Sequence, residues 1–333
     1  MQTIKSILVC FVLLAVFAAD AQAVTMIWSA VGNPGNPADS TVMTDGTSGY
    51  GSVGYAYNIG TNDVTTSQYV EFLNSKDPAG ANALNLYSMS MNGIRFSAAN
   101  PLGTKYSVQS TVFLHPANHP MNYVTWYDTI RFANWMNNGQ GSGDTETGAY
   151  TLGTLGAGAV PISPPLTHNA GAHIWLPTEN EWYKAAYYDP NSSSYLRYGT
   201  GSNTVPTATT PTATPNSANY AEAIGGSAGQ ASDVGAYTGT MSPYGAFDMA
   251  GNANQWNETL INGSMRGLRG GGFNFQAPGL SSSSRFNDNP IDIQDFFGFR
   301  LASVINIPEP STLVLAAFGF TALAAWGWRR RKH

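Results

Sequence analysis

The sequence WLPTENEW at residues 175–182 decides how the centre of this chain folds. Thr178 followed by Glu181 is a capping-box pattern, in which each side chain accepts a hydrogen bond from the backbone of the other residue at the start of a helix. Pro177 precedes the cap, where its fixed φ sets the direction in which the chain enters. The stretch therefore predicts a helix that begins at Thr178 and buries Trp182.

Two more short helices are predicted toward the N-terminus. Thr65 or Thr66 is the expected N-cap of a helix over residues 67–74, where apolar residues recur at helical spacing. A second helix follows Trp126 and carries Asp128 in its first turn, where a negative charge suits the helix dipole. The rest of the chain is punctuated by Gly and aromatic residues. This pattern predicts one α+β domain with little regular secondary structure.

Glycine-rich motifs continue toward the C-terminus. Residues 244–256 read YGAFDMAGNANQW, residues 268–273 read LRGGGF, and residues 298–300 read GFR. Glycines in such positions permit close approach of the backbone, because they have no Cβ. Between the central helix and these motifs lies a stretch rich in Thr, Pro, Ser and Ala, which includes residues 205–215. It is predicted to be a surface loop within the domain and not a linker between two domains.

The N-terminus is typical of a secretory signal peptide. Lys5 supplies a positive charge, and residues 7–19 form an apolar run that is shorter than a stop-transfer helix. Ala21-Gln22-Ala23 offers a small-x-small cleavage pattern. We expect cleavage after Ala23, so that residues 1–23 are absent from the mature protein.

The C-terminus combines three features in a fixed order: a Pro-Glu-Pro triplet, an apolar run over residues 312–328, and an arginine cluster. The residues that define its two ends are Pro308, Glu309, Pro310, Arg329, Arg330 and Arg331. The run can just span a bilayer, with the basic cluster on the cytoplasmic side. An ordinary membrane anchor would explain this pattern, but the three features together resemble a PEP-CTERM sorting signal. The resemblance implies that an exosortase recognises and removes residues 307–333. The precursor would be anchored in the inner membrane of a Gram-negative bacterium that makes exopolysaccharide.

Cysteine usage and charge exclude several classes of function. The only cysteine is Cys10, inside the predicted signal peptide, so the mature protein has no disulfide framework, thiolate metal site or cysteine nucleophile. The chain has 15 Lys and Arg against 20 Asp and Glu, and five of the basic residues lie in the two terminal segments. The body between them is acidic and has no basic cluster, so nucleic-acid binding has no electrostatic support.

Taken in order, six motifs resemble the formylglycine-generating enzyme (sulfatase-modifying factor) family. They lie at residues 63–74, 120–135, 175–182, 244–256, 268–273 and 298–300. The resemblance runs from about Met26 to Ser303. It implies the family's variant of the C-type-lectin-like fold, and we assign residues 24–306 to this domain.

The resemblance also identifies a degenerate active-site segment. Oxidases of the family bind copper through two cysteines, in a segment similar to Arg-Gly-Gly-Ser-Phe-x-Cys with the second cysteine five residues later. The matching stretch keeps Arg269, but Gly272 stands at the serine position and Phe275 at the first cysteine position. Because Cu(I) needs thiolate ligands, we expect no copper, no catalytic residue in this segment and no oxidation of a sulfatase cysteine.

Relatives that use iron rely on histidine clusters instead. The mature body contains His115, His119, His168 and His173, and three acids follow the degenerate segment, namely Asp288, Asp292 and Asp295. A two-histidine, one-carboxylate iron site would use such residues. Nothing in the sequence places them together, and the simpler interpretation is that they lie in loops and polar turns.

Family members often hold structural calcium with Asn side chains, backbone carbonyls and an acidic residue. Asn252 matches one such site, in which Gln255 replaces the usual Glu. Asn219 matches a second site, whose acidic partner corresponds to Gly235, although Asp233 lies nearby. Missing carboxylates weaken calcium binding, so these asparagines and Gln255 are candidates for a weak Ca²⁺ site, with simple turn chemistry as the alternative.

Together, these features favour a non-catalytic module that is exported to the cell surface or extracellular matrix and binds a glycan, peptide or protein ligand. The alternative is a metal-dependent oxidoreductase of the nonheme-iron type, with redirected chemistry. A structural matrix component without a specific ligand is a third hypothesis. The sequence leaves open whether the protein is an enzyme.

Overall fold

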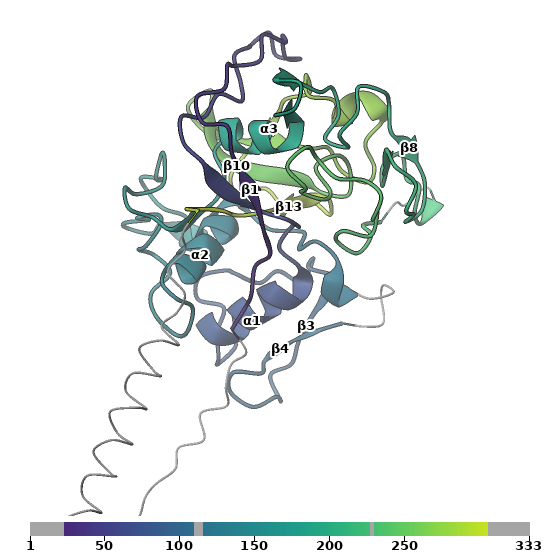
Figure 1. The fold of residues 1–333 in the computed structure, drawn as a ribbon. Coiled ribbons are helices and arrows are strands. Elements are labelled where there is room, and N and C mark those ends of the chain that lie inside the picture. The colour runs from purple at the N-terminus through teal and green to yellow at the C-terminus, as the bar shows by residue number, and fades with distance from the viewer. Residues whose placement is uncertain (1–22, 110–115, 227–229, 306–333) are drawn as a thin grey trace, which may run out of the picture.

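The computed structural model describes residues 23–109, 116–226 and 230–305. Two four-stranded sheets form its framework (Figure 1). The first sheet is antiparallel, in the order β1 (Trp28–Val31), β2 (Tyr57–Gly60), β14 (Ala302–Ser303) and β5 (Ile174–Trp175). It joins the start of the domain to its end, because β14 lies between β2 and β5.

The second sheet carries most of the C-terminal motifs. Its order is β12 (Phe286–Asp288), β11 (Met265–Arg269), β10 (Asn254–Ile261) and β13 (Phe297–Phe299). β10 pairs antiparallel with β11 and parallel with β13, so that Trp256 lies opposite Leu268 on one side and Phe299 on the other. The GNANQW and LRGGGF motifs are therefore adjacent in space.

Three α-helices occupy the predicted positions: α1 (Thr66–Lys76), α2 (Trp126–Asn137) and α3 (Glu179–Tyr187). Their N-caps are Thr65, Thr125 and Thr178, and each forms a complete capping box with the residue three positions later. The helix predicted to begin at Thr178 is confirmed. Each box satisfies backbone N–H groups that a helix otherwise leaves unpaired at its start.

The remaining elements are short. Three two-stranded pairs are β3 (Ile94–Phe96) with β4 (Tyr106–Val108), β6 (Tyr188–Asp189) with β7 (Ser194–Tyr195), and β8 (Thr207–Ala208) with β9 (Ser217–Ala218). The 3₁₀ turns are η1 (Pro116–Asn118), η2 (Ala157–Ala159) and η4 (Ala277–Leu280). Figure 1 shows α1, β3 and β4 at one end of the molecule, and α3 and β8 at the other. Little regular structure was predicted, and this is confirmed.

The core is built on aromatic residues. Trp126, Trp182 and Trp256 are fully buried in one large cluster that includes residues from both sheets and all three helices. Replacing such a side chain by Ala typically costs about 3–5 kcal/mol. A smaller apolar cluster gathers Tyr198, Tyr220 and Leu280 near β9. The two clusters together form the hydrophobic core of one domain, although most of its strands are short.

Among the residues that the structure describes, no helix is long and apolar enough to cross a membrane. The predicted signal peptide, the predicted membrane helix at 312–328 and the sorting residues Pro308 to Arg331 lie outside those residues. The signal peptide and the membrane helix therefore stay predictions from the sequence.

Candidate functional site

Buried arginines hold the segment that the resemblance matches to the family's active site. The side chain of Arg269, at the end of β11, is fully buried and donates through Nε to Glu179 Oε1 at 2.9 Å. Its Nη1 also donates to the carbonyl oxygens of Ser282 and Ser284, at 2.9 and 2.7 Å. The paired carboxylate belongs to the first residue of α3, and Arg285 binds it from the other side at 2.8 Å. Residues 270–284 are thus clamped between α3 and β11.

Within this clamp, apolar side chains occupy the positions that the resemblance matches to the copper-binding cysteines of the family's oxidases. The Phe275 ring contacts Phe286 edge-on at 5.0 Å and Phe296 at 5.4 Å between centroids. Five residues later, at the second cysteine position, stands Leu280, which is fully buried and packs in the same small cluster as Phe275. We call the three rings of Phe275, Phe286 and Phe296, together with the adjoining Leu280, the aromatic cluster.

The serine position of the segment is closed as well. A Cβ added at Gly272 would lie 2.8 Å from the Cβ of Phe296, which is closer than real Cβ atoms approach one another. A serine side chain therefore does not fit beside the aromatic cluster. None of these side chains has an atom that binds a soft metal, so the residues present do not fit the copper of the family's oxidases.

Gln255 and Asn252, proposed as calcium ligands from the sequence, have oxygens that are already used. Gln255 Oε1 accepts hydrogen bonds from Trp182 Nε1 at 2.7 Å and from Arg300 Nε at 2.6 Å. Asn252 Oδ1 accepts from the backbone N–H of Ser232 at 2.8 Å. A cation at Gln255 would also face the buried guanidinium of Arg300. This pair does not fit calcium.

Asn219 lies beside Asn252, since its Nδ2 donates to Asn252 Oδ1 at 3.1 Å. Its own Oδ1 is buried and has no hydrogen-bond partner, and the same holds for Asp233 Oδ1. His119 Nε2 is 3.5 Å from Asp233 Oδ1, so this carboxylate would form an ion pair with the imidazole when the ring is protonated. Buried oxygens without a donor are ligands that calcium accepts. The oxygens of Asn219 and Asp233 are therefore each available to a calcium ion, whereas those of Asn252 and Gln255 are already used.

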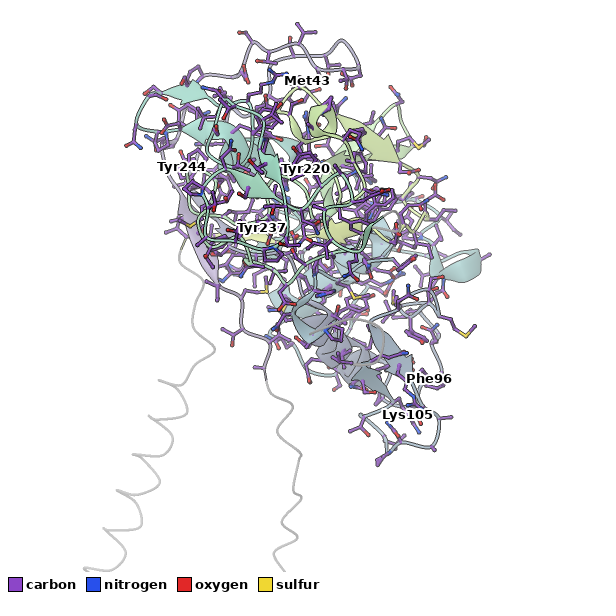
Figure 2. All side chains as sticks on the ribbon, turned by 90° about the vertical axis from the view of Figure 1, so that its right-hand side faces the viewer. Met43, Phe96, Lys105, Tyr220, Tyr237 and Tyr244 are labelled. Carbon is purple, nitrogen blue, oxygen red and sulfur yellow. The ribbon has the colours of Figure 1, made fainter. Side chains whose placement is uncertain are left out.

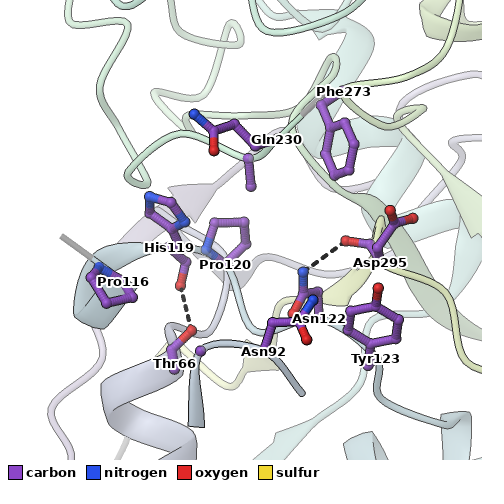
Figure 3. A pocket seen from close by; sticks show the side chains of 12 residues that line it. Thr66, Asn92, Pro116, His119, Pro120, Asn122, Tyr123, Gln230, Phe273 and Asp295 are labelled. Atoms are coloured by element: carbon purple, nitrogen blue, oxygen red, sulfur yellow. Dashed lines mark hydrogen bonds between the residues drawn. The ribbon is translucent and has the colours of Figure 1, made fainter. Parts of the chain in front are cut away.

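Beside the clamped segment lies a cavity of about 210 Å³, the polar pocket (Figure 3). Its walls come from the start of α1, the turn before β3, residues 116–123, residues 230–231, the degenerate segment and the loop before β13. The lining residues are Thr66, Asn92, Gly93, Pro116, His119, Pro120, Asn122, Tyr123, Gln230, Ala231, Phe273 and Asp295. Figure 3 shows Gln230 and Phe273 on one side of the pocket, and Asn92, Asn122 and Tyr123 on the other.

Tyr123 holds an unusual conformation in this pocket. Its φ is +55°, a region that bulky L-residues rarely adopt. The backbone is held there by a hydrogen bond from Tyr123 N to Gln294 O at 3.0 Å, and the adjacent Asn122 Nδ2 donates to Asp295 O at 2.8 Å. Such strain costs of order 1–3 kcal/mol and is concentrated at functional sites. Tyr123 is the only aromatic residue among the non-glycine residues with positive φ in the described structure, and we take the polar pocket that it lines as the candidate functional site.

Burial shapes the acid–base behaviour of the pocket. It raises the pKa of Asp295 above its ordinary value. The pKa of Tyr123 is also raised, mainly by burial and to a smaller extent by the nearby charge of Asp295. Asn92, Asn122 and Gln230 supply neutral donors and acceptors. The pocket thus offers several neutral hydrogen-bonding groups and one carboxyl group around a partly apolar floor, which suits a neutral polar ligand.

The predicted histidines do not gather. His119 lines the polar pocket, whereas His168 binds Glu258 Oε2 through Nδ1 at 2.7 Å and stacks on Trp175 at 4.9 Å. His173 is exposed, and His115 lies outside the described residues. Over residues 23–109, 116–226 and 230–305, no three His, Cys, Asp or Glu side chains lie close enough together to hold a metal.

Only one of the three aspartates lines the polar pocket, and the other two lie close to each other. Asp288 ends β12, and Asp292 has a pKa raised first by burial and then by a hydrogen bond with Asp288. Asp295 alone reaches the polar pocket. Sequence reasoning missed Asn92 and Gln230, which lie in no motif, and it assigned no role to Tyr123. The one available signal was that Asn122 and Tyr123 belong to the motif before α2.

Comparisons with known proteins identify the family and the sorting motif of this chain. The chain belongs to the sulfatase-modifying factor enzyme 1-like domain family, whose model matches residues 47–305. A second model, the PEP-CTERM protein-sorting motif, matches residues 306–332. The motif identifies an exported, membrane-anchored precursor of a Gram-negative bacterium that is processed by an exosortase. No curated protein matches the chain.

Solved structures of the same fold are distant in sequence. Treponema denticola variable protein 1 is 19% identical with a TM-score of 0.53, covering 85% of this chain and 97% of its own. CarF is also 19% identical with a TM-score of 0.53, covering 85% and 99%. PvdO from Pseudomonas aeruginosa is 16% identical with a TM-score of 0.46, covering 84% and 92%. The first two, together with the family match, confirm the predicted variant of the C-type-lectin-like fold.

Proposed function

We propose that this protein is a non-catalytic binding module displayed at the cell surface or in the extracellular matrix, and that the polar pocket holds its ligand. The observation that carries the proposal is the contrast between two adjacent sites. The aromatic cluster fills the positions that the resemblance matches to the copper ligands of the family's oxidases, while the pocket next to it keeps a strained Tyr123 and the polar side chains of Asn92, Asn122 and Gln230.

The chemistry of the lining favours a neutral polar ligand. Amide side chains and a tyrosine hydroxyl recognise hydroxyl groups and peptide groups through paired donors and acceptors. A saccharide unit of a glycan and a polar segment of a peptide or protein both meet this description. The sorting motif supports this proposal, because an exported protein can meet exported glycans and proteins.

The test is a binding screen with the purified mature protein. Oligosaccharides released from the producing cell's exopolysaccharide and a library of short peptides serve as probes, and each is measured over a concentration series. One saturable class of ligand is expected, and it would identify glycan or peptide as the partner. Oxidation of a cysteine peptide, faster with copper- or iron-loaded protein than with the metal-free form, would contradict the proposal. The absence of any saturable ligand would favour a purely structural role.

The alternative, an iron-dependent oxidoreductase, has no specific observation in its favour. It needs two histidines and a carboxylate around one ion, whereas His119 and His168 lie in separate environments. A calcium ion held by Asn219 and Asp233 is compatible with the binding proposal. It would fix residues 230–233, which carry one wall of the polar pocket.

A further inference from the structure

A second cavity, of about 340 Å³, lies beside α2 and shares no lining residue with the polar pocket. Its volume is within the range of about 300–1,000 Å³ that is usual for small-molecule sites. α2 forms one wall, and the other walls come from the loop after α1, the 3₁₀ turn η2 and the loop after β12. We call this cavity the charged pocket and define it by Leu84, Tyr127, Asp128, Arg131, Val160 and Ile291.

Two charged side chains of α2 line the charged pocket and are almost completely buried. Asp128 is 3% exposed and Arg131 is 2% exposed, and their spacing of three positions puts them on the same face of the helix. Among the described residues, Arg131 forms its ion pair with Glu146, at 2.7 Å, and not with Asp128. Burial raises the pKa of Asp128 to about 6, against the opposing effects of the hydrogen bonds from Thr125 and the charge of Arg131. The ionised carboxylate therefore has less compensation than its burial requires.

Each of these two side chains has one polar atom without a partner. Asp128 Oδ2 accepts hydrogen bonds from the backbone N–H and the hydroxyl of Thr125, at 2.8 and 2.7 Å, whereas Oδ1 accepts none from any described residue. Arg131 uses Nε and Nη2 to bind Glu146 and the carbonyl oxygen of Ala159, and its Nη1 has no partner in the described structure. Neither atom is among the fully enclosed unpaired atoms of the described residues. One acceptor and one donor are therefore available to a ligand in the cavity.

The remaining walls of the charged pocket are mainly apolar. Leu84, Val160 and Ile291 line it, and Ile291 is 50% exposed. The turn before Val160 is held by the hydrogen bond from Arg131 to the carbonyl oxygen of Ala159, at 2.7 Å. Ala159 itself has a φ of +58°, which residues other than glycine rarely adopt. Arg131 thus supports one wall and also offers Nη1 to the cavity.

The loop that carries Leu84 is tied to the β3–β4 pair. The ring of Tyr87, three residues later, contacts Phe96 on β3 at 6.2 Å and Tyr106 on β4 at 5.2 Å between centroids. Figure 2 shows Phe96 at the end of the molecule opposite Met43. The walls of the charged pocket are therefore held in place by packing and hydrogen bonds before a ligand arrives, which reduces the entropy cost of binding.

A ligand that matches this cavity needs a negative group for Arg131 Nη1, a positive group for Asp128 Oδ1 and an apolar body. We propose that the charged pocket binds an apolar α-amino acid as its zwitterion. The ligand carboxylate accepts from Arg131, its ammonium group donates to Asp128, and its side chain lies against the apolar walls. A simple amine leaves the guanidinium nitrogen without a partner, and a simple carboxylate leaves the charge of Asp128 uncompensated. The zwitterion satisfies both groups and adds no net charge to a buried site.

Calorimetric titration of the purified mature protein with three probes of similar shape tests the assignment, at a pH above the pKa of Asp128. Leucine has both charged groups, 3-methylbutylamine lacks the carboxylate, and 4-methylpentanoate lacks the ammonium group. We expect saturable binding of leucine and at least about tenfold weaker binding of the other two, because each lacks one charge-assisted hydrogen bond. No saturable binding of leucine, or equal binding of either single-charge probe, would overturn the proposal.

A charge variant tests the role of the carboxylate. Asp128→Asn keeps an oxygen to accept the hydrogen bonds of Thr125 but removes the charge. Leucine should bind to it at least about tenfold more weakly than to the wild type, whereas 4-methylpentanoate should bind no more weakly. The same leucine affinity in the variant and the wild type would contradict the assignment of the ammonium group to Asp128.

Two valine variants locate the site. Val160→Trp places a large ring in the charged pocket and should weaken leucine binding at least about tenfold, whereas Val42→Trp makes the same change at a valine that is 63% exposed and should bind like the wild type. Thermal melting checks that each variant is folded. Gln230→Trp, in the polar pocket, should also bind leucine normally, so this test is independent of the binding function proposed for that pocket. Normal leucine binding by folded Val160→Trp would show that the amino acid binds elsewhere and would overturn the proposal.

Discussion

The aromatic cluster and the polar pocket are neighbours, yet they are built in opposite ways. Phe275, in the cluster, and Phe273, in the pocket wall, are two residues apart. The cluster consists of apolar side chains whose rings pack edge-to-face, which contributes to stability. The pocket keeps polar groups and strain that packing alone does not require. Under our proposal, this difference means that the matched active-site segment contributes to packing while the adjacent pocket is available to a ligand.

The largest expected effect comes from putting cysteines back into the aromatic cluster. The double variant Phe275→Cys and Leu280→Cys removes much of two packed side chains and should lower the free energy of unfolding by about 3–5 kcal/mol. Urea denaturation measures the loss. Gln276→Cys, exposed and between the two positions, is the control and should change stability by less than about 0.5 kcal/mol. A double variant as stable as the wild type would mean that the cluster is not part of the core.

Calcium should stabilise the folded protein by binding beside the wall of the polar pocket, away from the aromatic cluster. At a free concentration 100 times the Kd, binding stabilises the folded state by about 2.7 kcal/mol. We expect a calcium-dependent rise in melting temperature that Asp233→Ala abolishes. Asp288→Ala, which removes a carboxylate outside the pocket lining, should leave the rise unchanged. A rise that survives loss of Asp233 would move the ion to another site.

The free energy of unfolding should depend on pH through two buried aspartates of the framework. Burial raises the pKa of Asp63 to about 7, although Arg300 at 2.9 Å lowers it, and raises that of Asp128 to about 6. The folded protein therefore holds protons that the unfolded chain has released above about pH 4. Stability should fall as the pH rises from about 4 through 6 and 7.

Chemical denaturation at a series of pH values measures this slope. Asp128→Asn keeps an oxygen to accept the Thr125 capping bonds but removes the titration, so its slope should be shallower. The same stability at pH 5 and pH 8 in the wild-type protein would contradict the raised pKa values.

The smallest effect on stability is expected at Tyr123. Tyr123→Gly loses side-chain contacts but relieves a positive φ that costs of order 1–3 kcal/mol, so the net change should be within about 1 kcal/mol. Binding should nevertheless be lost with the side chain. Calorimetry on the same sample measures both quantities. A variant that binds normally would remove Tyr123 from the site.

Much of the fold follows from local sequence signals, whereas the pocket does not. The capping boxes at Thr65, Thr125 and Thr178 involve residues three positions apart, so a short window of sequence contains the whole interaction. Absence of mature cysteines likewise predicts that thiolate chemistry is missing. The absence of cysteines does not predict that Leu280 and Phe286 pack around Phe275, because that packing joins residues that are distant in sequence.

The polar pocket depends on contacts that are distant in sequence. Its lining extends from Thr66 to Asp295, and each contributing segment supplies only a few residues. The His168–Glu258 pair, 90 residues apart, is hidden from sequence for the same reason. Gln255 could be identified as a departure from the family pattern, but its binding to Trp182 and Arg300 required the structure.

The measurement that tests the binding proposal most directly is a titration of three proteins with the probe selected in the screen. Gln230→Trp places a large ring in a cavity of about 210 Å³, and Gln276→Trp makes the same change at an exposed glutamine outside the pocket lining. The wild type and Gln276→Trp should give the same saturable isotherm, and Gln230→Trp should bind at least about tenfold more weakly, a loss of about 1.4 kcal/mol. Equal binding by all three folded proteins would show that the polar pocket is not the ligand site.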